Sequence, residues 1–236
     1  MAQAACSYPR TIGRIGRAIL KSLSTMKPAL SDRLAIVFDF GGVIFDWDPR
    51  YLYLKFFNGD RQAVDRFLKE IQFAEWNLRQ DQGRPFSVAV TEHCARFPQY
   101  CDLIRAYDTH WEESIRGPID GTIEILGSLS QEGYPLYALS NWSAEKFALI
   151  RPRYAFFDWF ETILISGSVG IVKPDPQIFT LLFEQIGRPA GECLVIDDSH
   201  QNIRAAQQMG CLTIHFQSPV QLELELTKLG IAAPKE

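Results

Sequence analysis

Five polar side chains of this sequence could together perform chemistry on an anionic group. They follow short apolar runs, and they are Asp39, Ser140, Lys173 and the adjacent pair Asp197 and Asp198. An ionised carboxylate at the end of a buried strand is costly to desolvate unless a cation meets it. Two adjacent carboxylates likewise repel each other unless a cation or a proton intervenes. Brought together, the five would supply a nucleophile, a metal site, a cation and a hydroxyl donor.

Each of these residues also has an ordinary structural explanation when it is taken alone. Asp39 could form the turn at Gly41 and Gly42. Ser140 and Asp198 could cap the helices that follow them, and a lysine before a helix is often a surface residue. A functional site is therefore predicted only if the fold brings the five side chains to one place.

Short strands and helices are expected to alternate along most of the chain. Apolar runs at 34–40, 135–140, 162–166, 193–196 and 212–216 are typical of buried strands, with helical patterns between them. Such alternation predicts an α/β fold in which helices cover both faces of a doubly wound parallel sheet. Ligands bind these sheets beyond the carboxyl ends of the strands. The polar residues stand at those ends.

The alternation is interrupted between residues 49 and 116. This segment has helical periodicity, many aromatic residues and no convincing strand. We therefore expect a small α-helical subdomain at 49–116, inserted into a core formed by residues 32–48 and 117–236. Arg79 and Arg84 are candidate substrate contacts on this subdomain, although exposure at the surface is the favoured interpretation.

The first 31 residues differ in kind from the rest. They carry several basic residues and no acidic residue, and they lack the long apolar centre of a secretory signal. We expect 1–31 to be an extension outside the core, either a disordered stretch before a natural start at Met26 or a targeting segment. A cytoplasmic location is the first expectation, and an organelle reached through this extension is the alternative.

The composition limits the classes of partner. Hydrophobic residues make up 47% and charged residues 22%, an ordinary globular balance. The net charge of −4 gives no electrostatic footprint for nucleic acid. A run of about eighteen apolar residues, which a membrane span requires, is missing. The five cysteines show no CxxC spacing, which favours reduced thiols over a disulfide framework or a zinc site.

Four ordered stretches together resemble the motifs of the haloacid dehalogenase superfamily. They are VFDFGGVIFD at 37–46, LYALSN at 136–141, KPDPQIF at 173–179 and LVIDDSHQN at 194–202. The similarity covers the chain from about Leu34 to its end, and the motifs have the right order and spacing. The resemblance implies a Rossmann-like α/β core. It also implies that the helices at 49–116 are the C1-type cap of a subfamily I member.

The resemblance assigns roles to the polar residues. It implies that Asp39 is a nucleophile that attacks phosphorus and forms an acyl-phosphate. Ser140 and the backbone of Asn141 would hold phosphoryl oxygens, and Lys173 would bind there too and neutralise charge on the nucleophile and the phosphate.

The same resemblance implies a magnesium site. Asp39, the carbonyl of Gly41 and Asp198 would ligate Mg²⁺, with Asp197 and Asn202 nearby as further ligands or as their partners. Hard oxygen donors that leave room for water and phosphate suit this ion.

Gly41 departs from the commoner phosphatase pattern. Phosphatases of this superfamily usually carry a second aspartate there, two residues after the nucleophile, as general acid and base. Some sugar-phosphate phosphatases of the superfamily have glycine instead, and this chain is similar to them. Asp46 and Asp48 follow soon after and could substitute, although a turn or linker role is the favoured interpretation.

By this resemblance, the chain is expected to be a Mg²⁺-dependent phosphatase that acts on a small, sugar-phosphate-like metabolite through an aspartyl-phosphate. One alternative is a metal-independent 2-haloacid dehalogenase, which Gly41 favours. The adjacent Asp197 and Asp198 argue against it, because they would repel a carboxylate substrate. The other alternative is a non-catalytic protein that keeps the fold. The complete set of polar residues argues against that interpretation.

Overall fold

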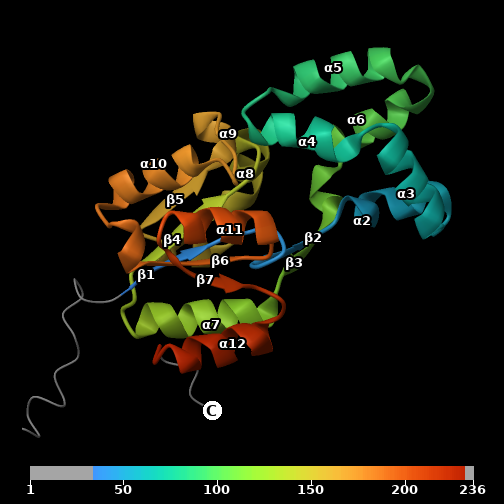
Figure 1. Cartoon of the computed structure of the whole chain (residues 1–236). Helices are drawn as coiled ribbons and strands as arrows, with labels where there is room; N and C mark the ends of the chain where they lie inside the picture. The colour runs from blue at the N-terminus through green and yellow to red at the C-terminus, as the bar shows by residue number, and fades with distance from the viewer. Residues whose placement is uncertain (1–33, 232–236) are drawn as a thin grey trace, which may run out of the picture. The chain divides into compact units, whose positions relative to one another are not determined.

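The computed structural model describes residues 34–231 (Figure 1), and the extension predicted at 1–31 lies outside the described residues. Five strands form one parallel sheet in the order β5-β4-β1-β6-β7. They are β1 (Ala35–Phe38), β4 (Leu136–Ser140), β5 (Thr162–Ile165), β6 (Cys193–Asp197) and β7 (Leu212–His215). No helix within residues 34–231 is long and apolar enough to cross a membrane.

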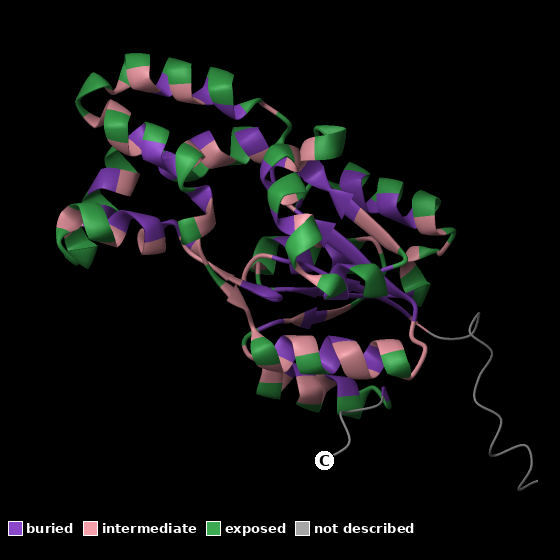
Figure 2. Cartoon of the chain, turned by 180° about the vertical axis from the view of Figure 1, so that it is seen from behind, coloured by how far each residue is buried: buried purple, intermediate pink, exposed green. Residues whose placement is uncertain are grey.

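Helices cover both faces of this sheet. Successive residues of a strand point to opposite faces, so Val37 packs into one apolar cluster and Ile36 and Phe38 into the other. The helices on the Val37 face are α10 (Pro176–Ile186) and α11 (His200–Gln208), and those on the other are α7 (Asp120–Gln131) and α12 (Pro219–Lys228). Figure 2 shows buried strands between helices that turn exposed faces outward. The predicted α/β fold is confirmed.

Short elements complete the core. They are α8 (Ala144–Ile150), α9 (Ser166–Val169) and the 3₁₀ turns η5 (Arg151–Arg153), η6 (Ala155–Trp159) and η7 (Ala190–Glu192). The central strand β1 lies between β4 and β6, and the chain leaves β1 and β6 toward opposite edges of the sheet. Parallel α/β sheets bind their ligands at such a switch point, beyond the carboxyl ends of the strands.

A second, antiparallel pair of strands connects the core to residues 49–114, which we call the insert. The pair is β2 (Phe45–Trp47) with β3 (Ile115–Pro118). The insert consists of α2 (Pro49–Tyr53), η2 (Leu54–Phe57), α3 (Arg61–Glu70), α4 (Phe73–Asp81), α5 (Phe86–Arg96), η3 (Pro98–Tyr100), α6 (Cys101–Thr109) and η4 (Trp111–Ser114).

The insert has an aromatic interior. Tyr107 is fully buried, and its ring contacts those of Tyr53, Phe73 and Trp76 at centroid distances of 4.8 to 6.3 Å. Aromatic pairs at such distances add to the stability that burial of their area gives. These contacts hold the helices of the insert around one small core.

One expectation about the cysteines is wrong. Cys94 and Cys101 form a disulfide, whereas all five cysteines were expected to be reduced thiols. The short turn η3 folds α6 back along α5 and brings the two Cα atoms to 4.5 Å, a distance that a disulfide requires. Cys193 and Cys211 are free and buried in the core.

Candidate active site

Asp39 follows β1 at the switch point of the sheet. Its backbone N–H donates to the Ile196 carbonyl oxygen on the neighbouring strand β6 at 2.9 Å, so the hydrogen-bond ladder between β1 and β6 continues up to this residue. One carboxylate oxygen accepts the N–H of Phe40 at 2.7 Å. The Ser140 hydroxyl, at the end of β4, donates to the same carboxylate. Two neighbouring strand ends thus place Asp39 and Ser140 face to face.

Lys173 lies between two carboxylates. Its ammonium nitrogen is 3.0 Å from Asp39 Oδ1 and 2.6 Å from Asp197 Oδ2, and only 1% of its side chain is exposed. Asn141 fixes the loop that carries it, because the Asn141 side-chain amide donates to the Lys173 carbonyl at 2.9 Å and accepts the Lys173 N–H at 2.8 Å. The sequence predicts that the backbone of Asn141 binds phosphoryl oxygens, which stays a prediction, and the structure shows that its side chain positions Lys173.

The two adjacent aspartates have different surroundings. Asp197 is fully buried and accepts hydrogen bonds from Ser199 N–H at 2.8 Å and from the Asn202 amide at 3.0 and 3.1 Å, besides the ion pair with Lys173. Asp198 is exposed, next to the turn at Gly42. A Cβ at Gly42 would lie 2.2 Å from Asp198 Oδ2, and Gly42 has a φ of +74°, so glycine is required there.

Carboxylate oxygens of Asp39, Asp197 and Asp198 lie within 4.8 Å of one another, close enough to share a metal ion. Burial raises the pKa of Asp39 to about 7, against the opposing effect of Lys173, and the two other carboxylates raise it further. Burial and Asp197 also raise the pKa of Asp198. Burial lowers the pKa of Lys173, but Asp39 and Asp197 outweigh burial and hold it above its ordinary value. The donors are hard oxygens, and the excess negative charge suits a divalent cation such as Mg²⁺.

A pocket between the core and the insert opens next to this group. Its empty space, counted together with the part open to solvent, is about 500 Å³. Gly41, Asn141 and Ser143 line it on the core side. Most of the remaining lining is aromatic and consists of Phe45, Trp47, Phe86, Tyr107, Trp111 and Trp142. A molecule attached to a group at Asp39 would extend into a largely apolar space.

One carboxyl group lines this pocket from the insert. Asp81 ends α4, and its carboxylate accepts a hydrogen bond from the Asn77 amide at 3.1 Å. Although Asp81 keeps part of its surface exposed, surrounding protein atoms desolvate the carboxyl, and burial raises its pKa to about 7. The N–H of Ser143 opposes this shift, and Asp39 adds to it. Asp81 is not among the residues predicted from the sequence, because a single aspartate at a helix end carries no pattern.

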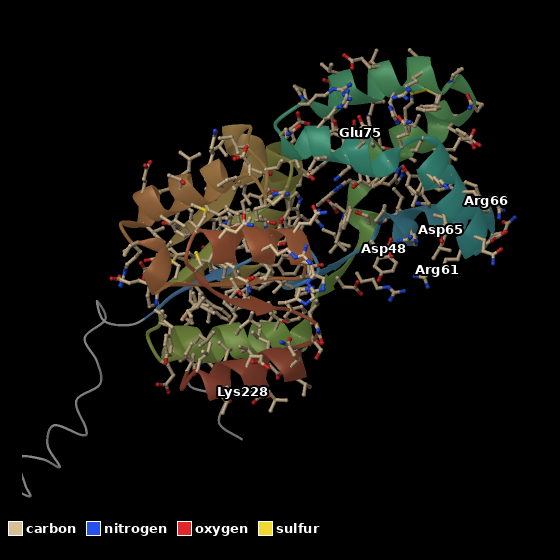
Figure 3. All side chains as sticks on the ribbon, viewed as in Figure 1. Asp48, Arg61, Asp65, Arg66, Glu75 and Lys228 are labelled. Carbon is tan, nitrogen blue, oxygen red and sulfur yellow. A yellow bond between two sulfur atoms is a disulfide. The ribbon has the colours of Figure 1, made fainter. Side chains whose placement is uncertain are left out.

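The other acidic candidates lie elsewhere. Asp46 accepts the hydroxyl of Tyr51 at 2.7 Å, and Asp48 caps α2 and lies near Arg61 (Figure 3). The favoured interpretation of both as linker residues agrees with these contacts.

The arginines proposed as substrate contacts also lie away from Asp39. Arg79 pairs with Glu75 and Arg84 with Glu92. Both arginines border a separate depression on the insert, together with His93. Arg79 is exposed, in agreement with the favoured interpretation, whereas the Arg84 side chain is only 19% exposed. Neither arginine lines the pocket next to Asp39.

Comparison with protein families gives a match over most of the chain. The profile of the haloacid dehalogenase-like hydrolases matches residues 34–210. The sesquiterpene phosphatase astK of Aspergillus oryzae is 26% identical over 207 residues, which are 83% of this chain and 95% of that protein. A phosphoglycolate phosphatase of Pectobacterium atrosepticum is 31% identical over 91 residues, 39% of each chain.

Solved structures share the fold. The enzyme BT-2542 of Bacteroides thetaiotaomicron, of the same family, is 21% identical, with a TM-score of 0.65 over 79% of this chain and 94% of that one. The same enzyme was also solved with magnesium bound. The L-2-haloacid dehalogenase of Xanthobacter autotrophicus is 19% identical, with a TM-score of 0.57 over 85% of this chain and 84% of that one. At these identities the likeness concerns the fold.

Proposed function

Because the chain belongs to the haloacid dehalogenase-like hydrolase family, we propose that it is a Mg²⁺-dependent phosphatase that hydrolyses the phosphate monoester of a small apolar alcohol. The observation that carries the proposal is the charge of the site. Three carboxylates gather around one ammonium, so two negative charges remain without a partner in the group. A divalent cation balances them and lets a phosphate approach.

Asp39 is the proposed nucleophile. Its carboxylate oxygen attacks phosphorus while the bond from phosphorus to the alcohol oxygen breaks, which gives an aspartyl-phosphate and the free alcohol. Lys173, held at 3.0 Å from Asp39, balances charge on the phosphoryl group. Water then attacks phosphorus, releases phosphate and restores Asp39. Ser140 and the Asn141 N–H bind phosphoryl oxygens in both steps.

The metal would be held by Asp39, the Gly41 carbonyl and Asp198. Bound there, Mg²⁺ would lower the pKa of Asp39 from about 7, keep its carboxylate ionised and attract the phosphate. Asp197 is not assigned to the metal, because its carboxylate oxygens already accept hydrogen bonds from Ser199 and Asn202 and pair with Lys173. We assign it to the orientation of Lys173.

The pocket lining supports an apolar organic group. A sugar phosphate, the class expected from the sequence, offers several hydroxyls that need hydrogen-bonding partners when they are buried. Six aromatic side chains line the pocket beside four polar ones, and burial of apolar surface against such rings is favourable. The relative astK is a sesquiterpene phosphatase, which supports the same class.

The test measures phosphate released from farnesyl monophosphate and from glucose 6-phosphate, each with Mg²⁺ and with excess chelator. We expect Mg²⁺-dependent release that is faster with farnesyl monophosphate. Faster release from the sugar phosphate would contradict the apolar substrate class. Undiminished turnover in chelator, or halide release from 2-chloropropionate, would contradict the phosphatase itself. Asp39→Asn protein, prepared in the same way, controls for contaminating phosphatases.

A further inference from the structure

We propose that Asp81 of the insert is the general acid and general base of the reaction, and thereby replaces the aspartate that is missing at position 41. This inference rests on the proposed phosphatase function. A general acid is needed at the leaving group. The alkoxide of an apolar alcohol is a poor leaving group unless it is protonated as the bond to phosphorus breaks, and general acid catalysis typically contributes about 10² to 10⁴ in rate.

The other polar groups of the site are already engaged. Lys173 donates to Asp39 and Asp197, and Ser140 donates to Asp39. Gly41 has no side chain to offer. Of the described residues that line the pocket, Asp81 alone carries a carboxyl group. Asp81 and Gly41 line the same pocket.

The position of Asp81 relative to the core is fixed by a single buried serine. The Ser166 hydroxyl donates to the Asp81 carbonyl at 2.6 Å and accepts the N–H of Trp142 at 3.0 Å. Ser166 is fully buried. One hydroxyl thus ties the end of α4 to the loop that follows β4, which also carries Asn141.

Close approach of the insert backbone to the core backbone reinforces this contact. A Cβ at Gly83 of the insert, which has a φ of +90°, would lie 2.9 Å from the Gly167 carbonyl oxygen of the core. Only glycines allow this packing without a shift of the backbone. The insert therefore meets the core tightly at the point where Asp81 lies.

The Asp81 carboxyl is held on both sides. The Asn77 amide donates to it at 3.1 Å, and Asn77 is itself held by the Tyr107 hydroxyl, which donates to Asn77 Oδ1 at 3.0 Å. The Ser143 N–H also donates to it. A pKa of about 7, caused mainly by burial and increased by the Asp39 carboxylate, lets the group both give and take a proton near neutral pH.

In the first step, protonated Asp81 gives its proton to the oxygen that bridges phosphorus and the alcohol carbon. The bond between phosphorus and that oxygen breaks while Asp39 bonds to phosphorus, and the neutral alcohol leaves. In the second step, the Asp81 carboxylate takes a proton from the water that attacks phosphorus. The bond between Asp39 and phosphorus breaks, phosphate leaves, and Asp81 is protonated again.

The test compares Asp81→Asn with the wild type on two substrates, farnesyl monophosphate and 4-nitrophenyl phosphate. The nitrophenolate ion leaves without protonation. We expect kcat/KM, which reports the steps up to release of the alcohol, to fall by about 10² or more for the farnesyl ester and by less than about tenfold for the nitrophenyl ester. The later hydrolysis of the aspartyl-phosphate is common to both esters and enters kcat alone. Asp46→Asn, which removes an acidic group outside the pocket, is the matched control and should keep the wild-type ratio of the two rates.

A rescue experiment guards against a purely structural effect. An added Cβ at Gly41 meets no atom within 4 Å, and Gly41 lacks a positive φ, so an aspartate fits there. Adding Gly41→Asp to Asp81→Asn should raise the rate on farnesyl monophosphate at least about tenfold above that of Asp81→Asn alone.

Two results would overturn the role of Asp81. One is an equal fall in kcat/KM for both substrates that Gly41→Asp does not rescue, which indicates a structural role. The other is an unchanged kcat/KM for both substrates. A wild-type protein that releases phosphate from neither substrate overturns the proposed function, and the inference with it. Wild-type turnover combined with an unchanged ratio in Asp81→Asn overturns the inference alone.

Discussion

Replacing Lys173 by methionine removes the ammonium that lies between two buried carboxylates. The side chain is 1% exposed, and its nitrogen lies 3.0 Å from Asp39 and 2.6 Å from Asp197. Loss of one partner from a buried ion pair costs about 3–5 kcal/mol, because the remaining charge is left without a partner. At about 2–4 °C per kcal/mol for a chain of this size, the melting temperature should fall by about 6–20 °C.

Mg²⁺ should recover part of this loss. An ion present at about 100 times its Kd stabilises the native state by about 2.7 kcal/mol. Without Lys173 the carboxylates carry more uncompensated charge and should bind Mg²⁺ more tightly. The gain in stability on adding Mg²⁺ should therefore be larger for Lys173→Met than for the wild type. Phosphatase activity should nevertheless stay at least about 10²-fold lower, because the charge on the phosphoryl group loses its partner.

The assay is urea unfolding at neutral pH, in chelator and in Mg²⁺. Lys146→Met is the matched control. Lys146 is 7% exposed and pairs at 2.6 Å with Asp108, whose side chain is 32% exposed, so its loss breaks a partly buried pair away from Asp39. Lys146→Met should lower the free energy of unfolding, but Mg²⁺ should stabilise this variant no more than it stabilises the wild type. A Lys173→Met protein within about 1 kcal/mol of the wild type in chelator, which is too little for a broken buried pair, would refute the reasoning.

Three further predictions concern Asp39, the insert and Gly41. Asp39→Asn should abolish phosphate release from 4-nitrophenyl phosphate while the circular dichroism spectrum is unchanged, since the amide is nearly isosteric but cannot attack phosphorus; retained turnover would exclude Asp39 as nucleophile. Bridging β2 to β3 in place of residues 49–114 should leave little discrimination among phosphate esters in a substrate panel, because five of the residues that line the pocket belong to the insert; surviving preference would assign specificity to core loops. Gly41→Asp alone should change the farnesyl monophosphate rate by less than about tenfold, because Asp81 already serves as the acid; a larger gain would mean that the wild type lacks one.

Much of the core site could be predicted because it depends on a simple geometric rule. The carboxyl ends of parallel strands meet at one edge of the sheet. Asp39, Ser140 and Asp197 each end or follow a strand of that sheet. Alternation of apolar runs with helices was enough to predict these strands. Lys173 joins the group through its loop, which Asn141 ties to the end of β4.

Asp81 could not be predicted in this way. Its nearness to Gly41 depends on how the insert docks on the core, and that docking rests on the contact of Ser166 with Asp81, 85 positions apart in the sequence. The disulfide between Cys94 and Cys101 was missed for a similar reason. The spacing of these two cysteines in the sequence does not reveal that η3 folds α6 back along α5.

The most direct test of the central claim is detection of phosphate bound covalently to Asp39. The enzyme is mixed with farnesyl monophosphate and Mg²⁺, quenched in acid during turnover, and reduced with borohydride, which converts an aspartyl-phosphate to homoserine. Peptide mass spectrometry should then find the reduced residue at position 39, and only when both substrate and Mg²⁺ were present. Turnover in which position 39 stays unmodified, or in which another residue carries the label, would contradict the account.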